Sequence, residues 1–162
     1  RYPVTGDIMD LKKGQSIIDV FDALLQSTDP ALAHVRVAAD AWTLTEIVGH
    51  LVDSAANNHQ RFARLLSGNL EQFPPYEAEI FVTVQQYDGC DFAEVAKFWR
   101  QYNWMLMHIM RAIPATALEN MWQRPDGAKS LRTLVEGYFE HIQMHTAQYR
   151  ERMQKVKDLA RI

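Results

Sequence analysis

Four long stretches of the sequence carry apolar residues three and four positions apart, and this spacing constrains the fold more than any other feature. The stretches span about residues 12–26, 43–66, 91–113 and 130–157. An apolar stripe that recurs with each helical turn is typical of a helix that buries one face. Four such helices within one domain predict an all-α protein built as a four-helix bundle.

Local signals mark where these helices begin. Thr43 and Glu46 form a capping box, in which the hydroxyl and the carboxylate bond free amide groups at a helix start. Asp91 with Glu94 resembles such a box, and Ser130 can cap the last helix. Glu46 lies one turn before a histidine of interest, but we interpret it as a capping residue and not as a metal ligand.

The connection between the second and third helices is the long one. It covers about residues 69–90 and contains Pro74-Pro75 and Asp88-Gly89. A connection of this length without strong periodicity is uncommon unless it crosses a bundle or covers a site. It permits the second and third helices to run parallel while the second and fourth run antiparallel. We therefore predict an up-down-down-up bundle with a long crossover between helices 2 and 3.

Composition places the chain among ordinary globular proteins and excludes several functions. Its 162 residues suit one domain, 1–162, with 48% hydrophobic and 23% charged residues. A net charge of −3 without a basic run argues against nucleic acid and against an anionic membrane. No apolar run approaches the roughly 20 residues of a membrane helix. The single cysteine, Cys90, excludes an internal disulfide, and we expect a cytoplasmic protein in which Cys90 is an ordinary loop thiol.

The last helix carries a histidine pair with metal-ligand spacing. His141 and His145 lie four residues apart, so their imidazoles share one face of the helix. Such a pair is half of a site, because zinc-type ions are held by at least three protein ligands. His50 on the second helix offers a third ligand. Taken alone, the pair is a weak signal, because such a pair more often consists of surface or core histidines than of metal ligands.

A polar stripe runs along the second helix beside His50. Ser54, Asn57 and Arg61 continue it at helical spacing, with Asp53 next to it. Packing surface on both sides of the stripe could make it the wall of a cleft, and a solvated helix face is the alternative. Asn57 and Arg61 could hold polar or anionic groups of a substrate. Asp53 could orient a ligating histidine, or it could be a solvated carboxylate.

The remaining histidines are weaker candidates for metal ligands. His59 lies half a turn round the helix from His50, and His34 lies in a connection. His108 lies among methionines of the third helix, where a packed or partly exposed histidine is expected.

Taken together, these motifs resemble the DinB/YfiT-like superfamily. The resemblance rests on Trp42, Thr43, Glu46, Gly49, His50, Leu51, Asp53, Ser54, Asn57, Arg61, Tyr138, His141 and His145. It implies a four-helix bundle with a divalent metal, usually zinc or nickel, held by His50, His141 and His145. Tyr138 joins Asp53, Asn57 and Arg61 as a candidate for substrate binding or ligand support. Members of known activity are thiol-dependent transferases that use bacillithiol, mycothiol or glutathione, and one group isomerises maleylpyruvate.

Three neutral histidines leave at least one coordination position open, which is typical of catalytic metal sites. Together with the resemblance, this leads us to expect a metal-dependent enzyme in which a low-molecular-weight thiol, deprotonated at the metal, attacks an electrophilic small molecule. We also expect a homodimer. Two alternatives remain open at this stage. One is a metal-dependent hydrolase, and the other is a non-enzymatic, dimeric helical module whose histidines are only structural.

Overall fold

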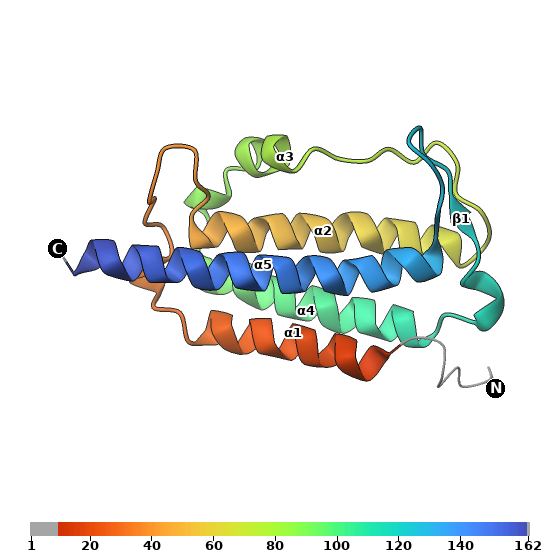
Figure 1. Cartoon of the computed structure of the whole chain (residues 1–162), viewed down its shortest axis with the longest axis horizontal. Coiled ribbons are helices and arrows are strands. Elements are labelled where there is room, and N and C mark those ends of the chain that lie inside the picture. Colours follow the sequence, from red (N-terminus) through yellow and green to blue (C-terminus); the bar gives the residue numbers. More distant parts are fainter. Residues whose placement is uncertain (1–9, 162) are drawn as a thin grey trace.

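Four long helices form the bundle in the computed structural model, which describes residues 10–161 (Figure 1). They are α1 (Leu11–Gln26), α2 (Leu44–Leu65), α4 (Phe92–Arg111) and α5 (Leu131–Ala160). All four predicted helices are present, with ends within a few residues of their expected positions. Residues 1–9 and 162 of the expected single domain lie outside the described residues.

The predicted caps are formed at the helix starts. Glu46 N–H donates to Thr43 Oγ1 at 3.2 Å, and Thr43 N–H donates to Glu46 Oε2 at 2.8 Å, which completes the capping box of α2. Asp91 caps α4 and Ser130 caps α5 through their side chains. Glu46 is also held by both terminal nitrogens of Arg36, at 3.0 and 2.9 Å. Both oxygens of its carboxylate are therefore hydrogen-bonded at the start of α2, so Glu46 is a capping residue, as the sequence predicted.

The helix directions confirm the up-down-down-up topology. Figure 1 shows α2 and α4 running in one direction and α1 and α5 in the other. The parallel pair α2 and α4 is joined by the crossover, which contains the short helix α3 (Ala78–Val84) and the 3-10 turn η2 (Tyr87–Gly89). The sequence did not predict α3, because seven residues span too few turns to give a periodic signal.

A small β-hairpin closes one end of the bundle. Strands β1 (Met121–Trp122) and β2 (Lys129–Ser130) pair antiparallel across a turn in which Gly127 has a φ of 121°. Leu70 of the crossover adds beside β1, since its N–H donates to Met121 O and its carbonyl accepts from Gln123 N–H, both at 2.9 Å. The hairpin thus anchors the start of the crossover at this end of the molecule.

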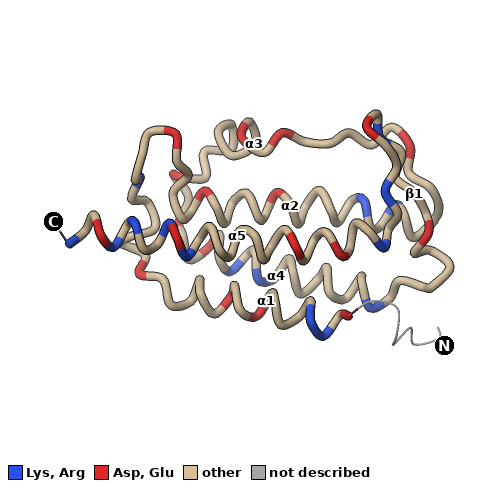
Figure 2. The backbone as a smooth tube through the Cα atoms, viewed as in Figure 1, with Lys and Arg blue, Asp and Glu red and all other residues tan. Residues whose placement is uncertain are grey.

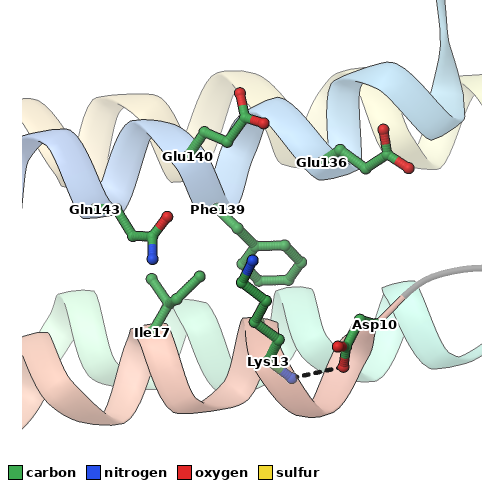
Figure 3. Close-up of a pocket in the computed structure, with 8 residues that line it drawn as sticks. Asp10, Lys13, Ile17, Glu136, Phe139, Glu140 and Gln143 are labelled. Atoms are coloured by element: carbon green, nitrogen blue, oxygen red, sulfur yellow. Dashed lines mark hydrogen bonds between the residues drawn. The ribbon is translucent and has the colours of Figure 1, made fainter.

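Aromatic side chains fill the space between the helices. Phe21, Trp99 and Tyr149 from α1, α4 and α5 meet edge to face, with ring centroids 4.9 and 5.4 Å apart. Such contacts add to the stabilisation that burial of these large apolar surfaces provides. Helices α1 and α5 approach closely where Phe139 points from α5 towards α1 and packs against Gly14 (Figure 3).

Charged residues of both signs are spread along the helices without a block of one sign (Figure 2). Within residues 10–161, no helix combines the length and the apolar character required to cross a bilayer.

Candidate metal centre

Three histidines from two helices converge between α2 and α5. His50 comes from α2, and His141 and His145 come from α5, the antiparallel neighbour of α2. The Nε2 atom of His50 lies 3.2 Å from that of His141 and 3.1 Å from that of His145, and the latter two are 3.0 Å apart. His50 and His145 are buried and His141 is half-buried. The three rings therefore present the same atom to one point.

Neighbouring side chains set the orientation of these rings. Nδ1 of His145 lies 2.6 Å from Oε1 of Gln148, and an amide oxygen can only accept, so Nδ1 carries the proton. The lone pair of His145 Nε2 is then free and faces the centre. Ser54 Oγ lies 3.3 Å from Nδ1 of His141, and the indole of Trp42 packs against the His50 ring with centroids 5.0 Å apart.

The surroundings keep all three imidazoles neutral at pH 7. Burial, with smaller contributions from His145 and His141, lowers the pKa of His50 to about 3. Burial and the neighbouring His145 lower the pKa of His141 to about 4. The pKa of His145 is also lowered by burial, and the Gln148 hydrogen bond opposes this shift. Neutral imidazole is the form that binds metal ions.

The donor set fits a divalent ion of the zinc type. Nitrogen ligands about 2.0–2.1 Å from a tetrahedral metal lie about 3.3 Å from one another, close to the observed Nε2 separations of 3.0–3.2 Å. Buried lone pairs that face one another without a cation would repel. In addition, Nδ1 of His50 has no hydrogen-bond partner in the described part of the chain, so no neighbour holds its ring in one tautomer. Imidazole nitrogens suit zinc, copper, iron and nickel alike, so the donor set does not define the metal.

A cleft of about 280 Å³ opens beside His141, between α2, α5, the hairpin and the crossover. Besides His141, its polar lining residues include Ser54, Asn58, Arg61, Tyr76, Lys129 and Thr133. Tyr138 and Gly137 of α5 also line it. The cleft is of a size that a small organic molecule can enter, and one of the three histidines lines it.

The structure places the predicted supporting residues in different surroundings. Arg61 is buried and lines the cleft. Tyr138 also lines the cleft, but its hydroxyl donates to Asn103 Oδ1 of α4 at 2.6 Å. Asn57 donates to the backbone oxygen of Asp53 at 2.9 Å and is not among the residues that line the cleft. Asn58, the next residue, lines it instead.

Asp53 is neither solvated nor hydrogen-bonded to one of the three histidines. It is 5% exposed, and its carboxylate accepts from Tyr87 Oη at 2.7 Å and from Gln85 Nε2 at 2.9 and 3.0 Å. Both donors belong to the crossover. Burial raises the pKa of Asp53, and these two hydrogen bonds oppose the shift. Asp53 therefore ties the crossover to α2, and the contacts expected of it are made by Gln148 and Ser54.

Sequence reasoning did not select Gln148, Asn58 or Trp42 as site residues. Gln148 follows His145 by three positions on the same helix face, which is a signal that the sequence contains. Trp42 precedes α2, and its contact with His50 depends on how the preceding loop folds back. The other histidines lie apart from the cluster, as expected: His59 bonds Tyr102 Oη at 2.9 Å, and His108 stacks on Trp104.

A second cleft lies between α1 and α5 (Figure 3). Its lining includes Asp10, Lys13, Glu136, Phe139 and Gln143. At 100° per residue, positions 139 and 143 of α5 lie on the helix face opposite His141. The described residues of this cleft offer no cluster of metal-binding side chains, so we assign the candidate site to the three histidines.

The fold is a helical bundle with a long crossover between parallel helices, and three histidines converge from two of its helices. These two features together define a class of candidate metalloproteins. A family model described as the DinB superfamily matches residues 16–149. The chain belongs to the DinB superfamily, as the resemblance of its motifs indicated.

Among solved structures, the chain is similar to YfiT from Bacillus subtilis, which is described as a probable metal-dependent hydrolase with an unusual four-helix bundle topology. The TM-score is 0.78 at 17% sequence identity, with 97% of this chain and 94% of that chain covered. At this identity the likeness shows a shared fold. No curated protein matches the sequence.

Proposed function

We propose that this protein is a divalent-metal-dependent enzyme in which His50, His141 and His145 are the ligands, and that it transfers a low-molecular-weight thiol to an electrophilic small molecule. The observation that carries the proposal is the convergence of three Nε2 atoms, 3.0–3.2 Å apart, at the wall of a cleft. Three protein ligands leave a coordination position for a reactant, and the cleft gives that reactant access.

Each neighbouring side chain has a part in this proposal. A divalent ion held by three imidazoles lowers the pKa of a thiol or water that it coordinates. Gln148 fixes the tautomer of His145, Ser54 supports His141, and Trp42 packs against His50. In the transfer, the thiol sulfur forms a bond to an electrophilic carbon, the leaving group departs with its electron pair, and the thiol proton goes to solvent.

Metal content tests the proposed ligands. Protein purified without chelators or a His-tag is analysed for zinc and nickel, beside His141→Ala and the control variant His108→Ala. His108 is an exposed histidine that stacks on Trp104, so its replacement leaves the cluster intact. We expect near-stoichiometric metal in the wild type and in the control, and little in His141→Ala. Equal metal content in all three proteins would refute the assignment of the metal site.

Thiol consumption tests the reaction. Metal-loaded protein is incubated with bacillithiol, mycothiol or glutathione and a model alkylating electrophile, and the S-conjugate is measured by mass spectrometry. We expect conjugate formation above background with one of these thiols in the wild type and only background in His141→Ala. Failure to consume any of the three despite full metal loading would count against transfer.

Hydrolysis is the second candidate, and the description of YfiT favours it. The same three ligands would then activate water in place of a thiol. A screen of ester and amide substrates in the absence of thiol separates the two reactions. Turnover that needs the metal and no thiol would support hydrolysis over transfer.

A further inference from the structure

Arg61 is a buried cation with no acidic partner in residues 10–161. It is 8% exposed, and its Nε has no hydrogen-bond partner there. Several other arginines of this chain are paired with carboxylates, among them Arg36 with Glu46 and Arg124 with Asp126, both at 2.9 Å. Because buried charges are costly, they are usually paired within the protein or with a ligand.

An aromatic platform holds the Arg61 guanidinium in place. Its carbon lies 4.2 Å from the ring centroid of Trp122, a contact in which the ring face attracts a cation. Trp122 is itself fixed, since it is 2% exposed and its Nε1 donates to Phe73 O at 2.9 Å. A guanidinium held on a rigid ring loses little freedom when it binds a ligand.

The same cleft contains a second cation and no carboxylate. Lys129 of β2 lines it together with Arg61, and Asn58 and Thr133 add an amide and a hydroxyl. None of its lining residues is Asp or Glu. Figure 2 shows basic residues on α2 and on the hairpin at this end of the bundle. The cleft therefore offers a positive potential and several hydrogen-bond donors to a ligand.

Arg61 and His141 both line the cleft, but they lie at different positions along the axis of α2. Ser54, which contacts His141, lies seven residues before Arg61 on α2. This separation corresponds to about 10 Å along the helix axis. A molecule in the cleft can thus place one end near His141 and the other near Arg61.

We propose that Arg61, with Lys129 as the second cation, binds an oxyanion group of a small organic acid, either a carboxylate or a phosphate. Arginine binds both groups through a bidentate pair of charge-assisted hydrogen bonds. The reacting group of the same molecule lies towards His141, and this part of the assignment rests on the proposed function. The anion site itself does not require the metal.

Anion binding to the full-length, metal-loaded protein tests the site. Inorganic phosphate and propionate are the probes in isothermal titration calorimetry, and propionamide is the neutral counterpart of propionate. The wild type is expected to bind both anions and not propionamide. Arg61→Met keeps the aliphatic stem over Trp122 and is expected to weaken binding about tenfold or more, the effect of losing charge-assisted hydrogen bonds. Lys129→Gln is expected to weaken it less, because Lys129 is exposed.

The controls separate this site from the metal. His141→Ala is expected to retain anion binding. Anion binding lost in His141→Ala but unchanged in Arg61→Met would place the anion at the histidines and overturn the proposal. Equal affinity for propionate and propionamide would overturn it as well. If Arg61→Met does not fold, Arg61→Lys replaces it, because lysine keeps the positive charge but lacks the planar guanidinium. This variant is expected to bind phosphate more weakly than the wild type. Unchanged affinity would overturn the assignment.

The two proposals can fail independently. A wild type that holds no metal but binds anions through Arg61 would refute the proposed function and leave the anion site. A metal-loaded, thiol-consuming wild type without measurable anion binding would do the reverse.

Discussion

The chemistry of the candidate centre depends on the residues that surround the three imidazoles and form hydrogen bonds with them. The Gln148 oxygen, 2.6 Å from His145 Nδ1, decides which nitrogen of that ring is unprotonated. Burial decides that the rings are neutral, since it is the largest cause of the lowered pKa of each histidine. At the residue scale, the orientation and the protonation of the cluster are thus set by neighbours and by solvent exclusion.

Replacement of Gln148 by Leu is expected to weaken metal binding about 10–100-fold, the usual effect of removing the partner of a ligating histidine. The matched control is Gln143→Leu, since Gln143 is exposed on the opposite face of α5. Competition with a chromogenic chelator measures both affinities. The same affinity in the two variants would show that the hydrogen bond does not support the site.

The stability of the metal-free protein is expected to fall as the pH drops from 7 to 5. In the folded protein, burial lowers the pKa of His50 to about 3 and that of His141 to about 4, whereas the pKa of an unfolded histidine lies near its ordinary value of 6.5. Between these values the unfolded chain binds more protons, so acid favours unfolding by up to about 1.4 kcal/mol per pH unit for each histidine.

Urea unfolding at several pH values in the presence of a chelator measures this dependence. His50→Gln removes one of the histidines whose pKa is lowered and should give a shallower slope than His108→Gln. An identical slope in the two variants would contradict the assignment.

At the scale of the elements, glycines decide how closely segments approach. A Cβ on Gly14 of α1 would overlap the Phe139 ring of α5, and one on Gly49 of α2 would overlap the Tyr87 ring of η2. The absence of a side chain at Gly49 therefore lets the crossover pack against α2, where the Tyr87 hydroxyl donates a hydrogen bond to Asp53. By contrast, Gly137 of α5 has no atom within 4 Å of its Cβ position in the described structure.

The glycines of α1 and α5 are expected to respond oppositely to alanine. Gly14→Ala should lower the free energy of unfolding by about 1–3 kcal/mol, because the Phe139 ring must move. Gly137→Ala should raise it by about 0.5–1 kcal/mol, because alanine is the better helix former and meets open space. Urea denaturation of both variants gives the two signs. If both substitutions stabilised the protein, the Phe139 ring would be able to move aside without a cost in free energy.

At the scale of the whole molecule, the topology brings remote parts of the chain to one site. His50 and His141 are 91 residues apart in sequence, and the crossover and the hairpin supply Tyr76 and Lys129 to the same cleft. An ion held between α2 and α5 would therefore join two helices that the chain itself connects only through α4.

Addition of zinc or nickel is expected to stabilise the whole fold. A ligand that binds only the native state at a hundred times its Kd adds about 2.7 kcal/mol to the free energy of unfolding. Thermal unfolding with and without each ion measures the effect as a rise in Tm. His141→Ala should show little of this rise, and an equal rise in wild type and variant would indicate binding elsewhere.

Much of the framework could be predicted from the sequence. The four helices, the caps at Thr43, Asp91 and Ser130, and the crossover follow from periodicity and end signals, which are local properties of the chain. The histidine pair followed from helical spacing, His50 was a candidate third ligand on the second helix, and the resemblance to the family supported this set. Local spacing also indicated a polar stripe, but it could not distinguish Asn57 from Asn58 as the residue that lines the cleft.

The tertiary structure alone decided what each of these side chains meets. The contact of Asp53 with Tyr87, the indole of Trp42 beside His50 and the Arg61–Trp122 pair join segments that are separate in sequence. The sequence by itself determined which residues form helices, because backbone hydrogen bonds and side-chain periodicity act over a few residues. Burial and partners were decided by packing, because they depend on where the crossover and the hairpin come to lie on the bundle.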